Sequence, residues 1–509
     1  MRFPRVTFVP DALRRGGAAE QSRPVTHALA PGRRPLLAAL GLPLGLGACD
    51  LARWLTPDAP GSGMALPSRL RLADAGEEPQ WPGAEWWRGF GSAELDALME
   101  AALAANQDIA VAEAQLRQAD AQIRIAGAGL LPQLTLNTQA TRQQTTVSTS
   151  SAAFTAPGAA PRKPIRKFSS DTLGFAGSYE IDFWGRNRAN AEAAQWSRSA
   201  SRFNLGTVRI TTAASVANTY FALLAAQEQL AIQRENLATA ERVLGVIRAR
   251  VQVGTATGLD LAQQETVVAQ LRAQVPPLLQ AAEQNRNALA VLAGRPPAAI
   301  AIEGGGLGRL AIPPVAPGLT AEILVRRPDV WQAEANLAAA NASVVAARAQ
   351  LLPAVTLTGS GGWQSLVLEN LIRPGSVVFN LAAGLSQPIF RGGALRGQVR
   401  LSEAQAAELL ASYRQAILSA LQDTEDAVVA LRETTGQEAL QAVAVRAAER
   451  AYAVSEAQLR AGTIDLVTLL NTQQTLFNAR NALVTARLDR LQAAVALFRA
   501  LGGGWDTPA

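Results

Sequence analysis

Residues 173–185 read Leu-Gly-Phe-Ala-Gly-Ser-Tyr-Glu-Ile-Asp-Phe-Trp-Gly, and they begin the stretch that decides the fold. From Leu173 to Phe183, mostly large apolar side chains alternate with small or polar ones, which predicts a β-strand with two different faces. The following 68 residues, Gly185 to Gln252, contain no proline and few glycines. At about 1.5 Å per residue they predict a helix about 100 Å long, which must extend beyond any compact domain.

The long helix is expected to end at Val-Gly-Thr-Ala-Thr-Gly, residues 253–258, where two glycines suit a tight reversal. A second helix then returns from Leu259. Pro276 and Pro277 interrupt this returning helix, because proline removes a backbone donor. A bend where the helix enters a wider part of the molecule is the simpler interpretation, and a moving hinge is the alternative.

The chain is duplicated. Residues 121–136 match residues 342–357 at an offset of 221, whereas the turn at 253–255 matches 461–463 at an offset of 208. The first half therefore holds about 13 extra residues, which we expect in a surface loop between Leu136 and Leu173. Each half reads helix, strand, loop, strand, very long helix, turn, helix.

This repeat divides the chain. The expected segments are a signal peptide at 1–48, an N-terminal segment and collar at 49–94, a first repeat at 95–300 with strands at about 133–147 and 171–184 and a turn at 253–258, a linker at 301–318, a second repeat at 319–502 with strands at about 354–364 and 376–388 and a turn at 461–465, and a tail at 503–509.

Composition favours packed helices and argues against nucleic-acid binding. The chain has 49% hydrophobic but only 5% aromatic residues. Residues 1–48 hold seven arginines and two acids, so the rest of the chain keeps about one of the six net positive charges. Such a body offers no basic surface for a nucleic acid.

Catalysis is not expected. The single histidine, His27, and the single cysteine, Cys49, lie in or beside the leader, which excludes histidine triads, cysteine nucleophiles and the usual zinc sites from the body. Glu180 and Asp182 have the spacing of a carboxylate pair, but we interpret them as solvated groups facing the lumen of a pore. The sequence predicts no cofactor and no metal.

The N-terminus has the pattern of an export signal. Arg33-Arg34 precede an apolar stretch that ends in Leu46-Gly47-Ala48-Cys49, which resembles a bacterial lipobox. We expect acyl chains such as palmitate on Cys49, and the alternative is an ordinary exported cysteine. Asp50 resembles the inner-membrane retention signal of enteric lipoproteins, and the true translation start is expected near Val25.

Four two-faced strands and no run of about 18 apolar residues suggest a barrel and not a membrane helix. Four strands cannot close, because small barrels need about eight, and an open sheet edge is not tolerated in lipid. The protein is therefore expected to oligomerise, with strands of several copies in one barrel and the long helices as a tube beneath it.

Motifs along the whole body carry a family resemblance. They are Trp86-Trp87-Arg88, Leu131-Pro132, Tyr179-Glu180-Ile181-Asp182-Phe183-Trp184-Gly185, Leu292-Ala293-Gly294, Arg326-Arg327-Pro328-Asp329-Val330 with Ala333-Glu334, Gln387-Pro388-Ile389-Phe390-Arg391-Gly392-Gly393, and Ala461-Gly462-Thr463. In this order they resemble the outer membrane factors of tripartite efflux pumps, the TolC-like channels, most closely the lipoprotein branch that works with resistance-nodulation-division pumps.

The resemblance implies a mainly α protein with a β-barrel portion. A homotrimer would form a twelve-stranded transmembrane barrel in the outer membrane, anchored by lipid, and continue as a long periplasmic α-helical barrel with a mixed α/β collar. Its expected partners are a periplasmic adaptor and an inner-membrane resistance-nodulation-division pump. Its implied function is a passive exit duct for drugs or other small toxic molecules.

The resemblance also assigns the functional residues. The two turns would dock the adaptor through Val253, Gly254, Thr255, Ala461, Gly462 and Thr463. At the aperture Asp260 matches the family pattern, whereas Leu459, Ile464, Thr468 and Asn471 replace the family's tyrosine, arginine and two aspartates. Asp465 is the nearest acid to the second turn. We therefore predict weaker cation selectivity than is usual in the family.

Two other functions are compatible with parts of this pattern. A type I secretion duct that passes proteins would have the same fold. A periplasmic coiled-coil adaptor or structural lipoprotein would differ in class, but adaptors carry one helical hairpin, and the duplication and four strands argue against one.

Only two lysines occur, Lys163 and Lys167, and both fall in the expected extra loop of the first half. A solvated loop is the simpler interpretation. Contact with the phosphates of lipopolysaccharide is the functional one.

Overall fold

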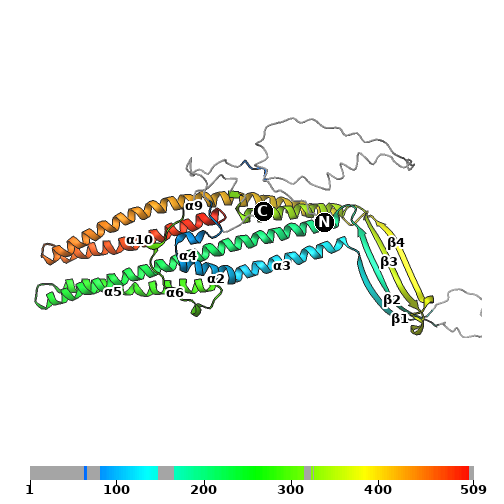
Figure 1. Ribbon diagram of the computed structural model, residues 1–509, viewed down its shortest axis with the longest axis horizontal. Coiled ribbons are helices and arrows are strands. Elements are labelled where there is room, and N and C mark those ends of the chain that lie inside the picture. Colours follow the sequence, from blue (N-terminus) through cyan, green and yellow to red (C-terminus); the bar gives the residue numbers. More distant parts are fainter. Residues whose placement is uncertain (1–61, 66–80, 147–164, 315–322, 325, 504–509) are drawn as a thin grey trace, which may run out of the picture.

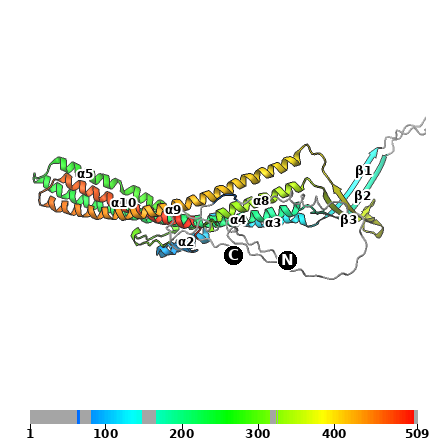
Figure 2. The same cartoon turned by 90° about the horizontal axis from the view of Figure 1, so that it is seen from above.

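The computed structural model describes residues 62–65, 81–146, 165–314, 323–324 and 326–503. The molecule is a long shaft of helices with a four-stranded sheet at one end and two helical turns at the other (Figures 1 and 2). Cys49 and the whole expected signal peptide lie outside the described residues.

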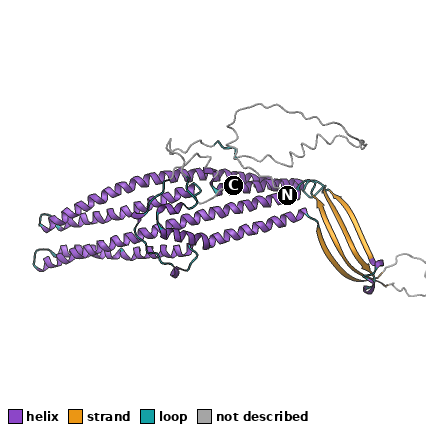
Figure 3. Ribbon diagram, in the orientation of Figure 1, coloured by secondary structure: helices purple, strands orange, loops and turns teal. Residues whose placement is uncertain are grey.

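Each half of the chain repeats one unit (Figure 3). The first half comprises α2 (Ala93–Ala105), α3 (Gln107–Gly127), β1 (Gln133–Thr146), β2 (Ile165–Ile181), α4 (Arg186–Gln252), α5 (Gly258–Ala273) and α6 (Val275–Leu292). The second comprises α8 (Pro328–Ala349), β3 (Ala354–Ser365), β4 (Val377–Ser386), α9 (Ala394–Arg460) and α10 (Leu466–Ala500). The predicted mainly α fold with a β portion is confirmed.

The two long helices, α4 and α9, have 67 residues each. Both begin after a glycine with positive φ, Gly185 at 78° and Gly393 at 83°. A side chain would be strained there, so glycine allows the sharp change from strand to shaft. Pro276 and Pro277 lie in the opening turn of α6, just after α5 ends, where missing N–H groups cost least.

The sheet has the order β1-β2-β3-β4, and every neighbouring pair is antiparallel. The pairing of β2 with β3 joins the two halves, with Leu173 opposite Trp363 and Gly174 opposite Gly362. β1 and β4 remain as the two edges, each with a row of backbone groups that lacks a neighbouring strand within the sheet.

Two expectations about β2 are wrong. The strand was expected at about 171–184, but it begins at Ile165 and ends at Ile181, so part of the predicted extra loop is strand. Asp182 does not face a lumen from the strand. It accepts hydrogen bonds from the backbone N–H groups of Asn187 at 3.0 Å and Arg188 at 2.9 Å, and so satisfies the first turn of α4.

The core lies midway along the shaft, where the N-terminal segment packs on α4 and α10. Trp86 stacks on Phe498 at 5.0 Å between ring centroids, and Phe90 lies 5.0 Å from Phe221. Such aromatic burial dominates core energetics. The collar was expected to be mixed α/β, but within the residues that the structure describes it consists of helices and short 3-10 turns.

Among the described residues, no helix combines the length and the hydrophobicity that a membrane crossing requires.

Glu334 on α8 is a half-buried titratable group. Burial raises its pKa to about 7. Burial also raises the pKa of Tyr413 on α9 to about 12, with the charge of Glu334 as a second cause. The folded chain thus holds the Glu334 proton more tightly than the unfolded chain does. The resulting stability is full below the unfolded pKa and is lost as the pH rises through about 7.

We therefore expect Glu334→Gln to remove a loss of about 1–3 kcal/mol between pH 4.5 and pH 8. Thermal unfolding at several pH values measures it: the variant should gain stability over the wild type at pH 8 and not at pH 4.5. The exposed Glu408 on α9 supplies the matched control, Glu408→Gln. Parallel pH profiles for Glu334→Gln and the wild type would show the expectation to be wrong.

Candidate functional site: two helical turns and a sheet wall

The first turn, residues 253–258, reverses the chain between α4 and α5. Gly254 has a φ of 77°, and its N–H bonds to the carbonyl of Val251 at 3.0 Å. Thr255 donates twice to the carbonyl of Arg250, from its backbone N–H at 2.8 Å and from its hydroxyl at 3.1 Å. These bonds satisfy carbonyls that the end of a helix leaves free, and the positive φ explains the glycine.

The second turn, residues 461–465, has the same construction between α9 and α10. Gly462 has a φ of 72° and donates to the carbonyl of Leu459 at 3.1 Å. Thr463 donates to the carbonyl of Gln458 from its N–H at 3.0 Å and from its hydroxyl at 3.1 Å. Val253, Gly254, Thr255, Ala461, Gly462 and Thr463 are all exposed, at the end of the shaft that is farthest from the sheet (Figure 1).

Each turn carries one acid that caps the following helix, but at a different position: Asp260 is the third residue of α5, whereas Asp465 directly precedes α10. Before α5, Thr257 is the N-cap, and its N–H and hydroxyl both bond to Asp260 at 2.8 Å. Before α10, Asp465 is the N-cap and accepts from the N–H of Thr468 at 2.8 Å. The second turn therefore keeps a negative charge although position 468 is a threonine, because Asp465 lies three residues earlier.

Both carboxylates are kept ionised by these caps. The Thr257 N–H and then its hydroxyl lower the pKa of Asp260 below its usual value. Hydrogen bonding from the Thr468 side chain and backbone lowers the pKa of Asp465. The other two proposed aperture residues carry no charge: Leu459 is half-buried on α9, and Asn471 is exposed on α10. Each chain thus places one ionised carboxylate at each of the two turns.

Ion pairs that the sequence did not reveal tie the two hairpins together above the turns. Arg480 on α10 lies 3.2 Å from Glu235 of α4 and 3.2 Å from Glu449 of α9. Arg487, two turns further along α10, lies 3.4 Å from Glu228 of α4 and 3.3 Å from Glu438 of α9. Arg480 and Arg487 are seven residues apart and so share one face of α10, and this spacing is the sequence feature that could have indicated the ion pairs.

Buried amides add a second link, between α4 and α5. Gln233 of α4 donates to the carbonyl of Leu271 at 2.8 Å, and Gln264 of α5 donates to the carbonyl of Ala240 at 2.8 Å. Each side chain is almost fully buried, so the pair of bonds fixes how the two helices lie against each other.

The sheet has one apolar face and one polar face. The apolar face carries Leu136 opposite Phe175, and Phe379 and Leu381 on β4 are 86% and 83% exposed. The other face is uncharged along its middle. Its residues are Gln133, Thr135, Asn137, Gln139 and Thr141 on β1, Thr172, Gly174, Ala176 and Ser178 on β2, Thr358, Ser360, Gly362 and Gln364 on β3, and Val378, Asn380, Ala382 and Gly384 on β4.

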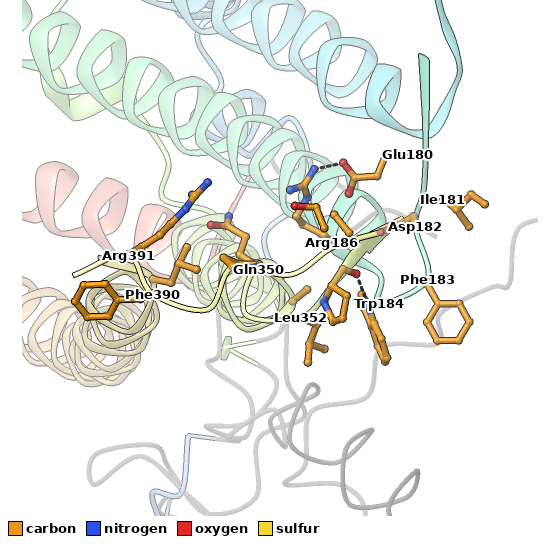
Figure 4. A pocket seen from close by; sticks show the side chains of 16 residues that line it. Glu180, Ile181, Asp182, Phe183, Trp184, Arg186, Gln350, Leu352, Phe390 and Arg391 are labelled. Carbon is orange, nitrogen blue, oxygen red and sulfur yellow. Dashed lines mark hydrogen bonds and ion pairs between the residues drawn. The ribbon is translucent and has the colours of Figure 1, made fainter. Parts of the chain in front are cut away.

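A cavity of about 300 Å³ marks the junction of sheet and shaft (Figure 4). Arg186 lies 2.5 Å from Glu180, and the indole N–H of Trp184 donates to the carbonyl of Pro353 at 2.7 Å, which links the two halves. Glu180 and Asp182 are thus engaged with Arg186 and with the start of α4. They are not a free carboxylate pair of the kind that catalysis requires.

Comparison with known proteins identifies the family. A family model described as outer membrane efflux protein matches residues 98–295 and 319–503. The chain belongs to the outer membrane efflux protein family. The resemblance drawn from the motifs is therefore confirmed, including the TolC-like fold.

Curated relatives and solved structures agree with this membership. The chain is 40% identical over 463 residues to the pyoverdine export outer membrane protein OpmQ of Pseudomonas aeruginosa, covering 91% of this chain and 95% of the relative. It is 32% identical over 481 residues to outer membrane protein OprJ of the same organism, covering 92% and 96%. The outer-membrane channel OprN superimposes with a TM-score of 0.80 at 26% identity, covering 88% and 99%.

Membership fixes the setting of the site. This efflux protein is the outer membrane channel component of an efflux pump: its sheet lies in the outer membrane, and its helices extend into the periplasm. The two turns, at the far end from the sheet, are therefore its periplasmic tips.

Proposed function

We propose that three copies of this efflux protein close one twelve-stranded barrel and act as a passive duct for small molecules, without catalysis. The observation that carries this proposal is the four-stranded sheet with two open edges and an exposed apolar face. In lipid the edges must pair, and β4 of one copy can pair with β1 of the next. The mass of the unheated, detergent-extracted protein tests it. Three copies of the processed chain are expected, each lighter than the 53.5 kDa of the full sequence because residues 1–48 are removed, and a monomer would contradict the barrel.

The proposed cargo is small, and the wall does not select strongly by charge. The uncharged middle of the polar sheet face would line the barrel, so it offers no fixed charge to attract or repel a solute. The names of relatives mention pyoverdine export, toluene and antibiotics, which are small molecules. These support a small-molecule duct over the secretion duct for proteins.

The proposed partners are a periplasmic adaptor at the two turns and an inner-membrane resistance-nodulation-division pump below it. A lipid on Cys49 would anchor the chain to the outer membrane. The turns suit docking because they are exposed and rigid. The hydroxyls of Thr255 and Thr463 bond to backbone carbonyls at the ends of α4 and α9.

The turn glycines allow a direct test. We expect Gly254→Ala and Gly462→Ala to strain each turn by about 1–2 kcal/mol, because the left-handed backbone disfavours a side chain. Adaptor binding should weaken several-fold while the trimer persists, since no atom lies within 4 Å of either new methyl group. Gly245→Ala, within α4 and equally unobstructed, is the control. Equal adaptor affinity of all three variants and the wild type would argue against docking at the turns.

The aperture leads to a second test. We expect planar-bilayer recordings to show only a modest cation preference above pH 5, where the lowered pKa values keep Asp260 and Asp465 ionised. Asp465→Asn should change the ratio of cation to anion permeability by less than about twofold, since salt screens an exposed charge within about 10 Å. A strong cation preference that Asp465→Asn abolishes would overturn this prediction.

A further inference from the structure

The outer end of β2 carries charged residues on the face that is apolar elsewhere. In strands, alternate residues share a face, so Lys167, Ser169 and Asp171 lie on the same side of the sheet as Leu173 and Phe175. Lys167 was expected in a loop, but it is an exposed residue of the strand.

Arg142 of β1 joins this group across the strand pair. Arg142 lies opposite Ser169, and Lys167 lies opposite Gln144. Arg142 and Lys167 are therefore diagonal neighbours on one face, with backbones about 7–8 Å apart. Two long cationic side chains at this separation can reach the same phosphate group or two phosphates of one headgroup.

Asp171 orients the arginine. The Nη1 and Nη2 atoms of Arg142 lie 2.6 Å and 2.9 Å from the two carboxylate oxygens of Asp171, and Nη1 also donates to the carbonyl of Thr141 at 3.1 Å. The Asp171 side chain is only 2% exposed, whereas that of Arg142 is 53% exposed. The carboxylate is thus covered, and the guanidinium is held in one orientation at the surface.

A bidentate edge of Arg142 remains available. A guanidinium has five N–H groups, and three are used by Asp171 and Thr141. The two left are Nε–H and one Nη2–H, which lie side by side and match two oxygens of a phosphate. Lys167 adds a compact positive charge next to this edge.

The height of the group relative to the apolar face identifies the ligand. The apolar face of β2 extends from Ile181 to Leu173, about 26 Å along the strand and about 20 Å across a membrane at a tilt of about 40°. Arg142 and Lys167 lie beyond Leu173, at the end farthest from the periplasmic shaft. The β3–β4 connection at the same end adds one exposed cation, Arg373, and one exposed acid, Glu369, which offset each other.

We propose that Arg142 and Lys167 form a binding site for a phosphate of the phosphorylated glycolipid in the outer leaflet, with Asp171 as the positioning residue. The inference rests on the proposed barrel, which turns the apolar face toward lipid. Arg142 would grip two phosphate oxygens through its free edge, and Lys167 would supply the second charge. Bound lipid would then fix the depth and rotation of each copy in the membrane.

Native mass spectrometry of the full-length, detergent-extracted protein tests the site with two probes: bisphosphorylated lipid A, and the same lipid with both phosphates removed. The wild-type trimer is expected to prefer the phosphorylated form at least fivefold. A cation near an anionic membrane surface contributes about 1 kcal/mol, so Lys167→Gln should reduce that preference about fivefold. Arg142→Gln combined with Asp171→Asn removes the pair without leaving a buried charge, and should reduce the preference as much or more.

Arg117→Gln on α3 is the matched control, an exposed arginine of the shaft, and should leave the preference unchanged. Equal binding of both lipids by a wild-type trimer, or an unchanged preference in both site variants, would overturn the lipid site and leave the channel standing. A wild-type monomer in the same spectra would overturn the barrel and the lipid site together.

Discussion

Replacement of Gly362 by alanine is expected to prevent assembly of the outer membrane channel. A methyl group at Gly362 would lie 2.3 Å from the carbonyl oxygen of Leu173 and 2.4 Å from the Cα of Gly174. Both atoms belong to the backbone of β2, so no side chain can rotate away, and the strands themselves must separate. Overpacking costs about 1–3 kcal/mol even where side chains can adjust, so we expect at least about tenfold less trimer.

The neighbouring Gly361 supplies the control for this experiment. It lies on the same strand, but its side-chain direction is open, with no atom within 4 Å. Gly361→Ala should therefore assemble normally. The two variants can be compared by the amount of trimer in outer membrane fractions and by resistance of the cells to a pump substrate. If both variants assembled equally well, the close pairing of β2 with β3 would not be what joins the two halves.

The contrast between these glycines shows what the sequence could predict and what it could not. Alternation of large and small residues indicated both strands, and an uninterrupted stretch without proline indicated the two 67-residue helices. Which of two adjacent glycines meets a neighbouring backbone depends on register and sheet twist, and neither is written in the local pattern.

The predicted start of β2 was wrong for a related reason. The predicted strand began at about 171, and the residues before it, Lys167, Phe168, Ser169 and Ser170, do not alternate between apolar and polar, so they give no periodic signal. The structure stabilises this part through the pairing of Arg142 with Asp171 across two strands, a contact between residues 29 positions apart. Residues 165–170 were therefore expected in a loop, because polar character alone does not distinguish a loop from a strand that extends beyond the membrane.

At the periplasmic tips, the sequence indicated the turns but not their chemistry. Compared with the family pattern one position at a time, residue 468 is a threonine in place of an aspartate, which suggested that the second turn lacks an acid. In both turns the structure shows the N-cap side chain accepting from the N–H three residues later: Thr257 from Asp260 and Asp465 from Thr468, so the two residue types are exchanged. An exchange of this kind is invisible when each position is compared alone, because capping depends on the pair.

Arg327→Met is expected to destabilise the shaft where the second half meets the collar. The Arg327 side chain is only 9% exposed and reaches three helices. It lies 2.6 Å from Asp329 of α8 and 2.9 Å from Asp423 of α9, and it donates to the carbonyl of Ala500 of α10 at 3.3 Å. Methionine is similar in volume but leaves the two carboxylates, 37% and 44% exposed, without their shared cation. Because water reaches both carboxylates, we expect a loss of about 1–3 kcal/mol.

The adjacent Arg326 distinguishes loss of this network from loss of any arginine. Arg326 is exposed and lies 4.5 Å from the ring centroid of Trp81, a contact worth about 0.5–1 kcal/mol at a surface. The temperature at which the detergent-resistant trimer dissociates should fall by several degrees more in Arg327→Met than in Arg326→Met. Adding Asp329→Asn and Asp423→Asn to Arg327→Met should recover part of the lost dissociation temperature, because the two unpaired negative charges are then removed. If the two arginine variants dissociated at the same temperature, the motif would act through overall charge, and α8, α9 and α10 would be held together by their apolar contacts alone.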